Sequence, residues 1–154
     1  MPGPCLPVPD IRVQAEPFDY GAVCATFARD AGGAGAVVTF LGLVRDDGGR
    51  LAAMEIEHYP GMTETALTAM AEQAAQRWSL ARVAIIHRHG RLLPGAPIMM
   101  VATAARHRDA AFAAAEFLMD YLKSRAPFWK KEIRADGANW VAARDEDEQA
   151  LKRW

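Results

Sequence analysis

The sequence predicts an α+β domain in which most of the sheet is antiparallel. From residue 36 onward, segments with strand character come in pairs, and amphipathic helices separate the pairs in the order ββ, α, ββ, α, ββ. The length of 154 residues suits one domain, and 51% hydrophobic against 24% charged residues is the balance of a globular protein. We therefore expect a single domain over residues 11–154, preceded by a disordered, proline-rich lead over residues 1–10.

The first half of the chain predicts three strands and a helix. A short strand at 11–13 precedes a helix at 19–29. The segment 36–44, AVVTFLGLV, is rich in β-branched residues and indicates a buried strand. Residues 51–59 alternate well enough for another strand, and the Asp-Asp-Gly-Gly sequence at 46–49 supplies a turn between these two strands.

The middle of the chain predicts two helices around another pair of strands. A helix begins at Thr63 and runs to about residue 78, with apolar residues along one side. Strands follow at 82–89 and 98–104, and a long helix covers 108–125. Pro127 ends that helix, because the residue before a proline is pushed out of the helical region. Strands at 128–134 and 139–143 then form a hairpin before a charged tail.

The charge balance excludes several function classes. The chain has 18 basic and 19 acidic residues, so its net charge argues against a protein that coats nucleic acid or an anionic membrane. No uncharged run is longer than 31–44, which is too short to span a bilayer. Cys5 and Cys24 form neither a disulfide framework nor a zinc motif, and the start lacks the basic region of a signal peptide. These features favour a soluble protein of the reducing cytoplasm, with no membrane or nucleic-acid partner.

Motifs for cofactors and metals are absent. The sequence has no dinucleotide fingerprint, Walker loop, HExxH or GxSxG. The four histidines lack convincing zinc spacing, and we interpret His87 and His89 as residues of an ordinary half-exposed strand. We therefore expect neither a metal nor a cofactor.

The segment 120–132 is unusual because four basic residues are interleaved with three aromatic ones. At 100° per residue, Lys123 lies at nearly the same helical angle as Phe112 and Met119, at the edge of the apolar stripe. A lysine there is partly desolvated, which lowers its pKa and favours reactivity or anion binding. Beyond Pro127 the chain should be extended, so Lys130 shares a face with Phe128 and Glu132.

Each of these features also has an ordinary structural explanation. Lys123 can extend its ammonium to solvent from an apolar face, and Lys130 can decorate an edge strand. His107 and Arg108 open the long helix, where amide groups favour an anion but a simple cap is equally expected. Arg45 is by default a solvated turn residue.

Four runs of sequence carry a family resemblance that changes this balance. Together with the closing tail they resemble the large, catalytic subunit of molybdopterin synthase, from about Pro17 to the C-terminus. The runs are GAVVTFLGLVR (35–45), EHYPGMTE (57–64), ATAARHRDAAF (102–112) and MDYLKSRAPFWKKE (119–132).

The resemblance implies an enzyme of molybdenum cofactor synthesis, a sulfurtransferase that converts cyclic pyranopterin monophosphate to molybdopterin. The sulfur would come from a thiocarboxylate on the C-terminal Gly-Gly of a small ubiquitin-like partner subunit. Two large subunits would form a central homodimer within a heterotetramer. The implied fold is α/β hammerhead-like, with an additional small antiparallel β subdomain.

The resemblance also assigns site residues by position. Lys123 and Lys130 match the catalytic lysines of the family. The substrate-binding positions are Leu43, Val44, Arg45, His107, Arg108, Lys131 and Glu132, and the pocket lining is Phe40, Met119 and Arg144. The residue types suit the chemistry, because fixed cations offset the repulsion between an anionic phosphate and an anionic thiocarboxylate.

One hypothesis follows from helix geometry. Arg108 and Lys123 lie at opposite ends of one helix, roughly 22 Å apart at 1.5 Å per residue. One small pterin cannot easily touch both, so we expect His107 and Arg108 to reach the site from the dimer mate.

Two alternatives come from other classes. The chain could be a non-catalytic dimeric module that binds RNA or a phosphorylated ligand through the Lys/Arg/aromatic segment 121–134, although the near-neutral charge argues against this. It could also be a structural scaffold, in which case replacing Lys123 would be harmless.

Overall fold

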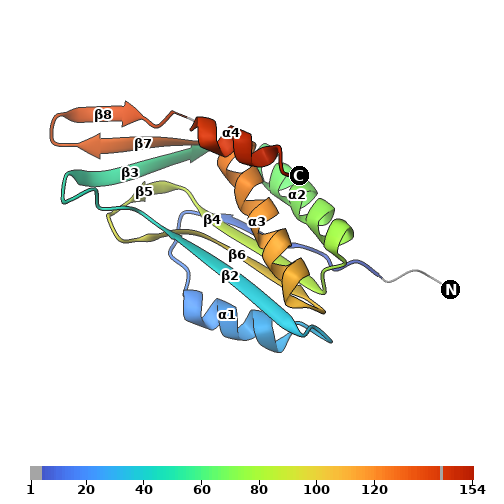
Figure 1. Cartoon of the computed structure of the whole chain (residues 1–154). Helices are drawn as coiled ribbons and strands as arrows, with labels where there is room; N and C mark the ends of the chain where they lie inside the picture. The colour runs from blue at the N-terminus through green and yellow to red at the C-terminus, as the bar shows by residue number, and fades with distance from the viewer. Residues whose placement is uncertain (1–4, 143) are drawn as a thin grey trace.

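The computed structural model describes residues 5–142 and 144–154 and contains two sheets and the helices that pack on them (Figure 1). Residues 1–4 of the expected lead and residue 143 of the expected last strand lie outside the described residues. The elements in chain order are β1 (Asp10–Gln14), α1 (Tyr20–Arg29), β2 (Ala36–Leu43), β3 (Leu51–His58), α2 (Met62–Trp78), β4 (Arg82–Arg88), β5 (Gly90–Leu92), β6 (Pro97–Ala105), α3 (Arg108–Ser124), β7 (Phe128–Arg134), β8 (Gly137–Trp140) and α4 (Asp145–Leu151).

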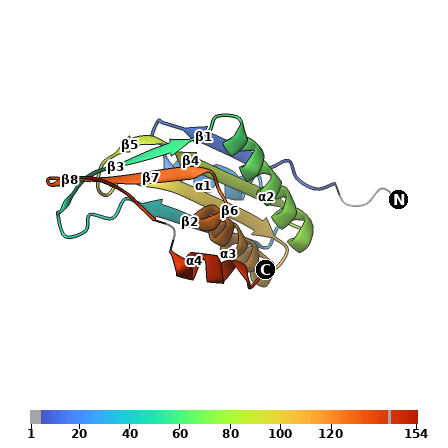
Figure 2. The same ribbon diagram turned by 90° about the horizontal axis from the view of Figure 1, so that it is seen from above.

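The larger sheet has the strand order β1-β4-β6-β2 and is covered on both faces. β1 pairs parallel with β4, whereas the other pairs are antiparallel. α2 and α3 lie side by side on one face, and α1 lies on the other (Figures 1 and 2). The alternation along β4 serves both layers, since Val83 and Ile85 belong to the core under α2 and α3, while Ala84 and Ile86 belong to the core under α1.

The smaller sheet has the order β5-β3-β7-β8 and is antiparallel throughout. It extends from one end of the molecule, above the ends of β2 and β4 (Figure 1). The two sheets and their helices confirm the predicted α+β class, the mostly antiparallel pairing and the small antiparallel β subdomain.

The expected turn between residues 36–44 and 51–59 does not make a hairpin, because the two strands belong to different sheets. β2 pairs with β6, and a bulge interrupts this pairing between Gly42 and Leu43. Val44 then donates its N–H to the Ala96 carbonyl (2.9 Å) and accepts from the Gly95 N–H (2.8 Å). This tie leads the chain out of the larger sheet, so that β3 pairs with β5 and β7 instead.

Two elements were not predicted from the sequence. β5 has only three residues, too few for a visible alternation. α4 lies in the charged tail and buries none of its residues, so it has no apolar stripe. Its first turn holds four acidic residues, which the positive end of the helix dipole stabilises. Within residues 5–142 and 144–154, no helix combines the length and the apolarity needed to cross a bilayer.

Candidate functional site

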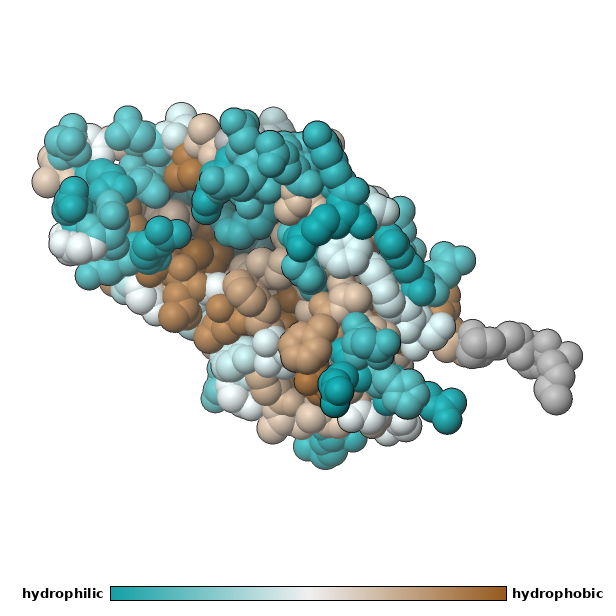
Figure 3. Space-filling view, in the orientation of Figure 1, coloured by the Kyte–Doolittle hydropathy of each residue, from teal (hydrophilic) through white to brown (hydrophobic). Residues whose placement is uncertain are grey.

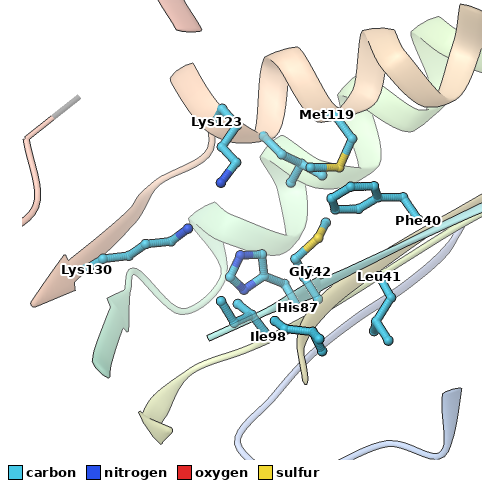
Figure 4. A pocket seen from close by; sticks show the side chains of 11 residues that line it. Phe40, Leu41, Gly42, His87, Ile98, Met119, Lys123 and Lys130 are labelled. Atoms are coloured by element: carbon cyan, nitrogen blue, oxygen red, sulfur yellow. The ribbon is translucent and has the colours of Figure 1, made fainter. Parts of the chain in front are cut away.

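Lys123 and Lys130 line one cavity of about 370 Å³, here called the lysine cavity (Figure 4). α3 supplies Lys123, β7 supplies Lys130, and β2, β4 and β6 supply the opposite wall. The lining residues are Phe40, Leu41, Gly42, Leu43, His87, Ile98, Met99, Met119, Leu122, Lys123 and Lys130. Most of these side chains are apolar, so the cavity wall beside the two amines solvates charge poorly.

Lys130 is the more buried of the two lysines. β7 pairs with β3 so that Lys130 lies opposite Ile56, a core residue. Burial first and the positive charge of Lys123 second lower the pKa of Lys130 to about 8, and Asp147 partly opposes both effects. An amine with this pKa exchanges its proton near neutral pH, as a general acid or base must.

Lys123 lies in the last turn of α3, and its side chain is exposed. The expectation of a partly desolvated Lys123 was therefore wrong, and Lys130 is the lysine that burial affects. The helix ends one residue later, so Lys123 projects past the apolar stripe into an open space. Its charge lies at the negative end of the helix dipole, a favourable position for a cation.

A second cavity of about 430 Å³, here called the aromatic cavity, lies on the other side of the lysines. Its walls come from the end of α3, from β7 and from the segment that connects β8 to α4. It shares four residues with the lysine cavity, and these are His87, Leu122, Lys123 and Lys130. The two amines therefore lie where the two cavities meet. The further lining residues are Ser124, Ala126, Phe128, Trp129, Trp140, Val141, Ala142, Arg144 and Asp147.

His87 is a residue of this junction that the sequence did not identify. It is 3% exposed, so the interpretation as part of a half-exposed strand was wrong. Its ring stacks on Phe128, with ring centroids 3.7 Å apart and planes 14° from parallel. Burial lowers the pKa of His87 to about 3, so the imidazole is neutral at physiological pH. The available signal was its place after Val83 and Ile85 on the core-facing side of β4.

The expected pocket-lining residues all border one of the two cavities. Phe40 and Met119 line the lysine cavity, with Phe40 partly exposed at its rim. Leu43, expected to bind substrate, also lines this cavity. Arg144 lines the aromatic cavity and forms an ion pair with Glu146.

Lys131 and Glu132 follow Lys130 on β7 but line neither cavity. Lys131 points to the opposite face, where it lies 3.6 Å from the Glu55 carboxylate and over the ring of Trp140. Glu132 accepts a 2.7 Å hydrogen bond from Arg134. Both charges are therefore paired within the smaller sheet.

Val44 and Arg45 lie just beyond the lysine cavity. Val44 is buried in the core, and its N–H and carbonyl are both used by the turn at 95–96. It can hold the backbone of Arg45 but has no free amide for a ligand. Arg45 is exposed and lines neither cavity.

His107 and Arg108 lie at the other end of α3 from the lysines. They line a separate open cavity with Gly35, Ala36 and the neighbouring residues of the same turn. Within one copy of the chain, this site and the lysine cavity share no residue. The structure thus separates them in the way that helix geometry predicted.

These features define a class of site. Two amines of unequal burial meet between two cavities, so the site can bind two anionic ligands and move a proton between them. Within the described residues, no group of three or more His, Cys, Asp or Glu side chains is arranged to hold a metal ion. Such a junction suits an enzyme whose ligands carry negative charge.

Comparison with known proteins identifies the family. Residues 13–125 match the family model described as MoaE protein. The chain is 70% identical to the molybdopterin synthase catalytic subunit of Cereibacter sphaeroides over 94% of this chain and 99% of that protein. It is 55% identical to the solved molybdopterin biosynthesis MoaE protein of Burkholderia ambifaria, with a TM-score of 0.79 over 94% of this chain and 97% of that one.

A more distant structure shares the fold. It is a chain in the protein–protein complex of subunits 1 and 2 of the molybdopterin-converting factor of Helicobacter pylori, 19% identical, with a TM-score of 0.73 over 90% of this chain and 92% of that one. The chain described here belongs to the MoaE family, the catalytic subunits of molybdopterin synthase.

Proposed function

We propose that this chain transfers sulfur from the thiocarboxylated C-terminal glycine of a small ubiquitin-like partner to cyclic pyranopterin monophosphate, giving molybdopterin. In each transfer a C–S bond to the pterin forms and water cleaves the acyl–S bond of the partner, which returns its glycine as an ordinary carboxylate. Two loaded partners therefore supply one dithiolene. We place the reaction in the cytoplasm, where thiols stay reduced, because Cys5 and Cys24 are both free.

The observation that carries the proposal is the junction of two cavities at Lys123 and Lys130. Sulfur transfer brings the thiocarboxylate of the partner's tail to the phosphate-bearing pterin. Each cavity can hold one of these two anions, and both cavities border the same two amines. We assign the partner's tail to the aromatic cavity, because Trp129, Trp140 and Val141 expose apolar surface beside it. The pterin is assigned to the lysine cavity.

The chemistry assigned to the lysines follows from their charges. Two ammonium groups offset the repulsion between a phosphate-bearing pterin and a thiocarboxylate, and the apolar walls strengthen this attraction. Lys130, with its pKa lowered to about 8, can give a proton to the departing oxygen and take one back from water. Lys123 stays closest to the tail because it borders the open side of the junction.

The remaining basic residues are proposed to come from a second copy of the chain. β2 forms a free edge of the larger sheet, and Val37, Phe40 and Phe112 expose apolar side chains beside it. Figure 3 shows apolar surface gathered along this part of the molecule. Pairing two copies here would bury that surface and bring His107 and Arg108 of one copy to the lysine cavity of the other. There the amide groups that open α3 favour a phosphate.

The test is reconstitution with thiocarboxylated small subunit and cyclic pterin, with molybdopterin as the product measured. We expect Lys123→Ala and Lys130→Ala each to reduce the rate by at least about a hundredfold while leaving the far-ultraviolet circular dichroism unchanged. Lys152→Ala, at an exposed tail position, is the matched control and should keep wild-type turnover. Wild-type rates in both site variants would remove the catalytic proposal.

A further inference from the structure

His87 breaks the pattern of its own strand. On the face of β4 that α2 and α3 cover, the side chains are Val83, Ile85 and then His87, where an apolar residue would bury more favourably. An imidazole at a 3% exposed position loses hydration that only hydrogen bonds restore. A polar residue at a core position where two cavities meet indicates a ligand contact.

The hydrogen bond that His87 makes fixes the state of its ring. Its Nδ1 lies 2.8 Å from the carbonyl oxygen of Arg88. A carbonyl can only accept, so Nδ1 carries the proton, and Nε2 of the neutral ring bears a lone pair. Nε2 has no hydrogen-bond partner among the residues that the structure describes, and the ring lines both cavities. One acceptor that opens onto the cavities is therefore available to a ligand.

The position of this acceptor is also fixed. Stacking on Phe128 holds the ring plane, and the Arg88 bond holds the ring within that plane. Figure 4 shows a ring nitrogen of His87 turned toward the ends of Lys123 and Lys130. The junction thus offers two cations and one neutral acceptor, which together suit an anionic group with an N–H close beside it.

A C-terminal glycine has this pattern, because its amide nitrogen lies two bonds from the carboxyl carbon. We propose that His87 Nε2 accepts a hydrogen bond from the amide N–H of the partner's terminal glycine while the lysines bind the (thio)carboxylate. This inference rests on the proposed function and adds a recognition contact to it. The contact with His87 sets the depth to which the tail enters.

The test removes two groups in turn. The first is the amide N–H of the partner's terminal glycine, and the second is the Nε2 acceptor of His87. The small subunit is prepared in its unreactive carboxylate form by semisynthesis, with either the terminal glycine or glycolic acid, in which an ester oxygen replaces the N–H. Calorimetric titration of the full-length chain should give about tenfold weaker binding of the ester form, the effect of losing one hydrogen bond to a buried acceptor. In His87→Phe the same replacement should change the dissociation constant by less than about twofold.

A second variant keeps the test valid if His87→Phe folds poorly. In His87→Asn the side-chain amide nitrogen takes the place of Nδ1 and can still bond the Arg88 carbonyl, but nothing occupies the position of Nε2. It should behave as His87→Phe does. His89→Phe alters a neighbouring histidine that lines neither cavity and should keep the full tenfold difference. The ester also changes the carbonyl group that precedes it in the small subunit. This change acts alike on binding to wild type and to each variant, so it does not affect the comparison between them.

The outcomes separate the two proposals. If the ester form binds more weakly by the same factor in wild type, His87→Phe and His87→Asn, the glycine contact is overturned. A His87 that contacts the pterin instead would give this same result. A wild-type chain that fails to bind the unmodified small subunit would overturn the glycine contact together with the proposed function.

Discussion

Lys123 and Lys130 approach one junction from different elements, the last turn of α3 and the third residue of β7. Burial is the largest cause of the lowered pKa of Lys130, and the positive charge of Lys123 is the second largest. The proton affinity of the buried amine therefore depends on the exposed one. The short connection through Pro127 keeps the amines of Lys123 and Lys130 at the same junction.

We expect Lys123→Ala to raise the pKa of Lys130 above about 8, because a like charge that disfavours the ammonium is removed. Burial remains, so the pKa should stay below the ordinary lysine value of 10.5. The measurement is the rate of acetylation of Lys130 as a function of pH, followed by mass spectrometry. Lys152→Ala is the control, and an unchanged profile in Lys123→Ala would show that the two amines are not coupled.

Lys130→Met should stabilise the fold at neutral pH while abolishing sulfur transfer. The folded pKa of about 8 lies below the unfolded value of 10.5, so the unfolded chain binds more protons between these pH values. The contribution of Lys130 to the free energy of unfolding of wild type is therefore lowest below pH 8, and it rises as the pH approaches 10.5. We expect Lys130→Met to gain about 1 kcal/mol at pH 7, with the gain shrinking as pH rises. Urea unfolding at pH 7 and pH 10 measures this; a gain that grows with pH would contradict it.

His87→Asn should make the fold less sensitive to acid. The folded pKa of His87 is about 3 and the ordinary value is 6.5, so only the unfolded chain takes up this proton as pH falls through that window. Wild type thus loses stability from this group below pH 6.5, and the variant should not. The difference is measured by urea unfolding between pH 7 and pH 4. His107→Asn, at an exposed position, should follow the wild-type curve. Parallel curves for His87→Asn and wild type would show that His87 is not held neutral.

Local patterns in the sequence predicted the helices and most strands, because an apolar stripe or alternation is visible within one segment. The separation of β2 from β3 was not predictable in this way. β2 pairs with β6, more than fifty residues later in the chain, and the tie of Val44 to residues 95–96 diverts the strand. Such long-range pairing leaves no signal in the turn at 46–49.

The candidate site was predictable as a pair of lysines but not as two cavities. Pro127 indicated a sharp change of direction between Lys123 and Lys130, and the structure brings both to one cavity. The aromatic cavity depends on Val141, Ala142 and Asp147, which follow β8, and no local pattern in their sequence indicates that they pack beside the lysines. His87 was missed because its polar side chain suggested an exposed position, although it follows Val83 and Ile85 on the core-facing side of β4.

Mixed dimers test whether each site draws on two copies of the chain. In a dimer of one Lys123→Ala and one Arg108→Ala subunit, a shared arrangement leaves one site intact, so we expect about half of wild-type activity. Two different affinity tags isolate the mixed dimer for assay. The matched control pairs Lys123→Ala with Lys130→Ala, which belong to the same cavity and should give no recovery. An inactive Lys123→Ala/Arg108→Ala dimer would show that both residues serve the same subunit.

Trp154 anchors the C-terminal end of the chain to α3, one turn before Lys123. Its indole N–H donates to the Asp120 carboxylate at 2.6 Å, and its ring packs edge-on against Trp78 and Phe117. We expect Trp154→Ala to lower the free energy of unfolding by about 3 kcal/mol through lost packing. Trp154→Phe keeps much of the packing and removes the N–H, and should cost only about 1 kcal/mol. Urea unfolding measures both. Equal losses would assign the anchoring to the hydrogen bond rather than to the ring, and no loss in either variant would contradict the docking of the tail on α3.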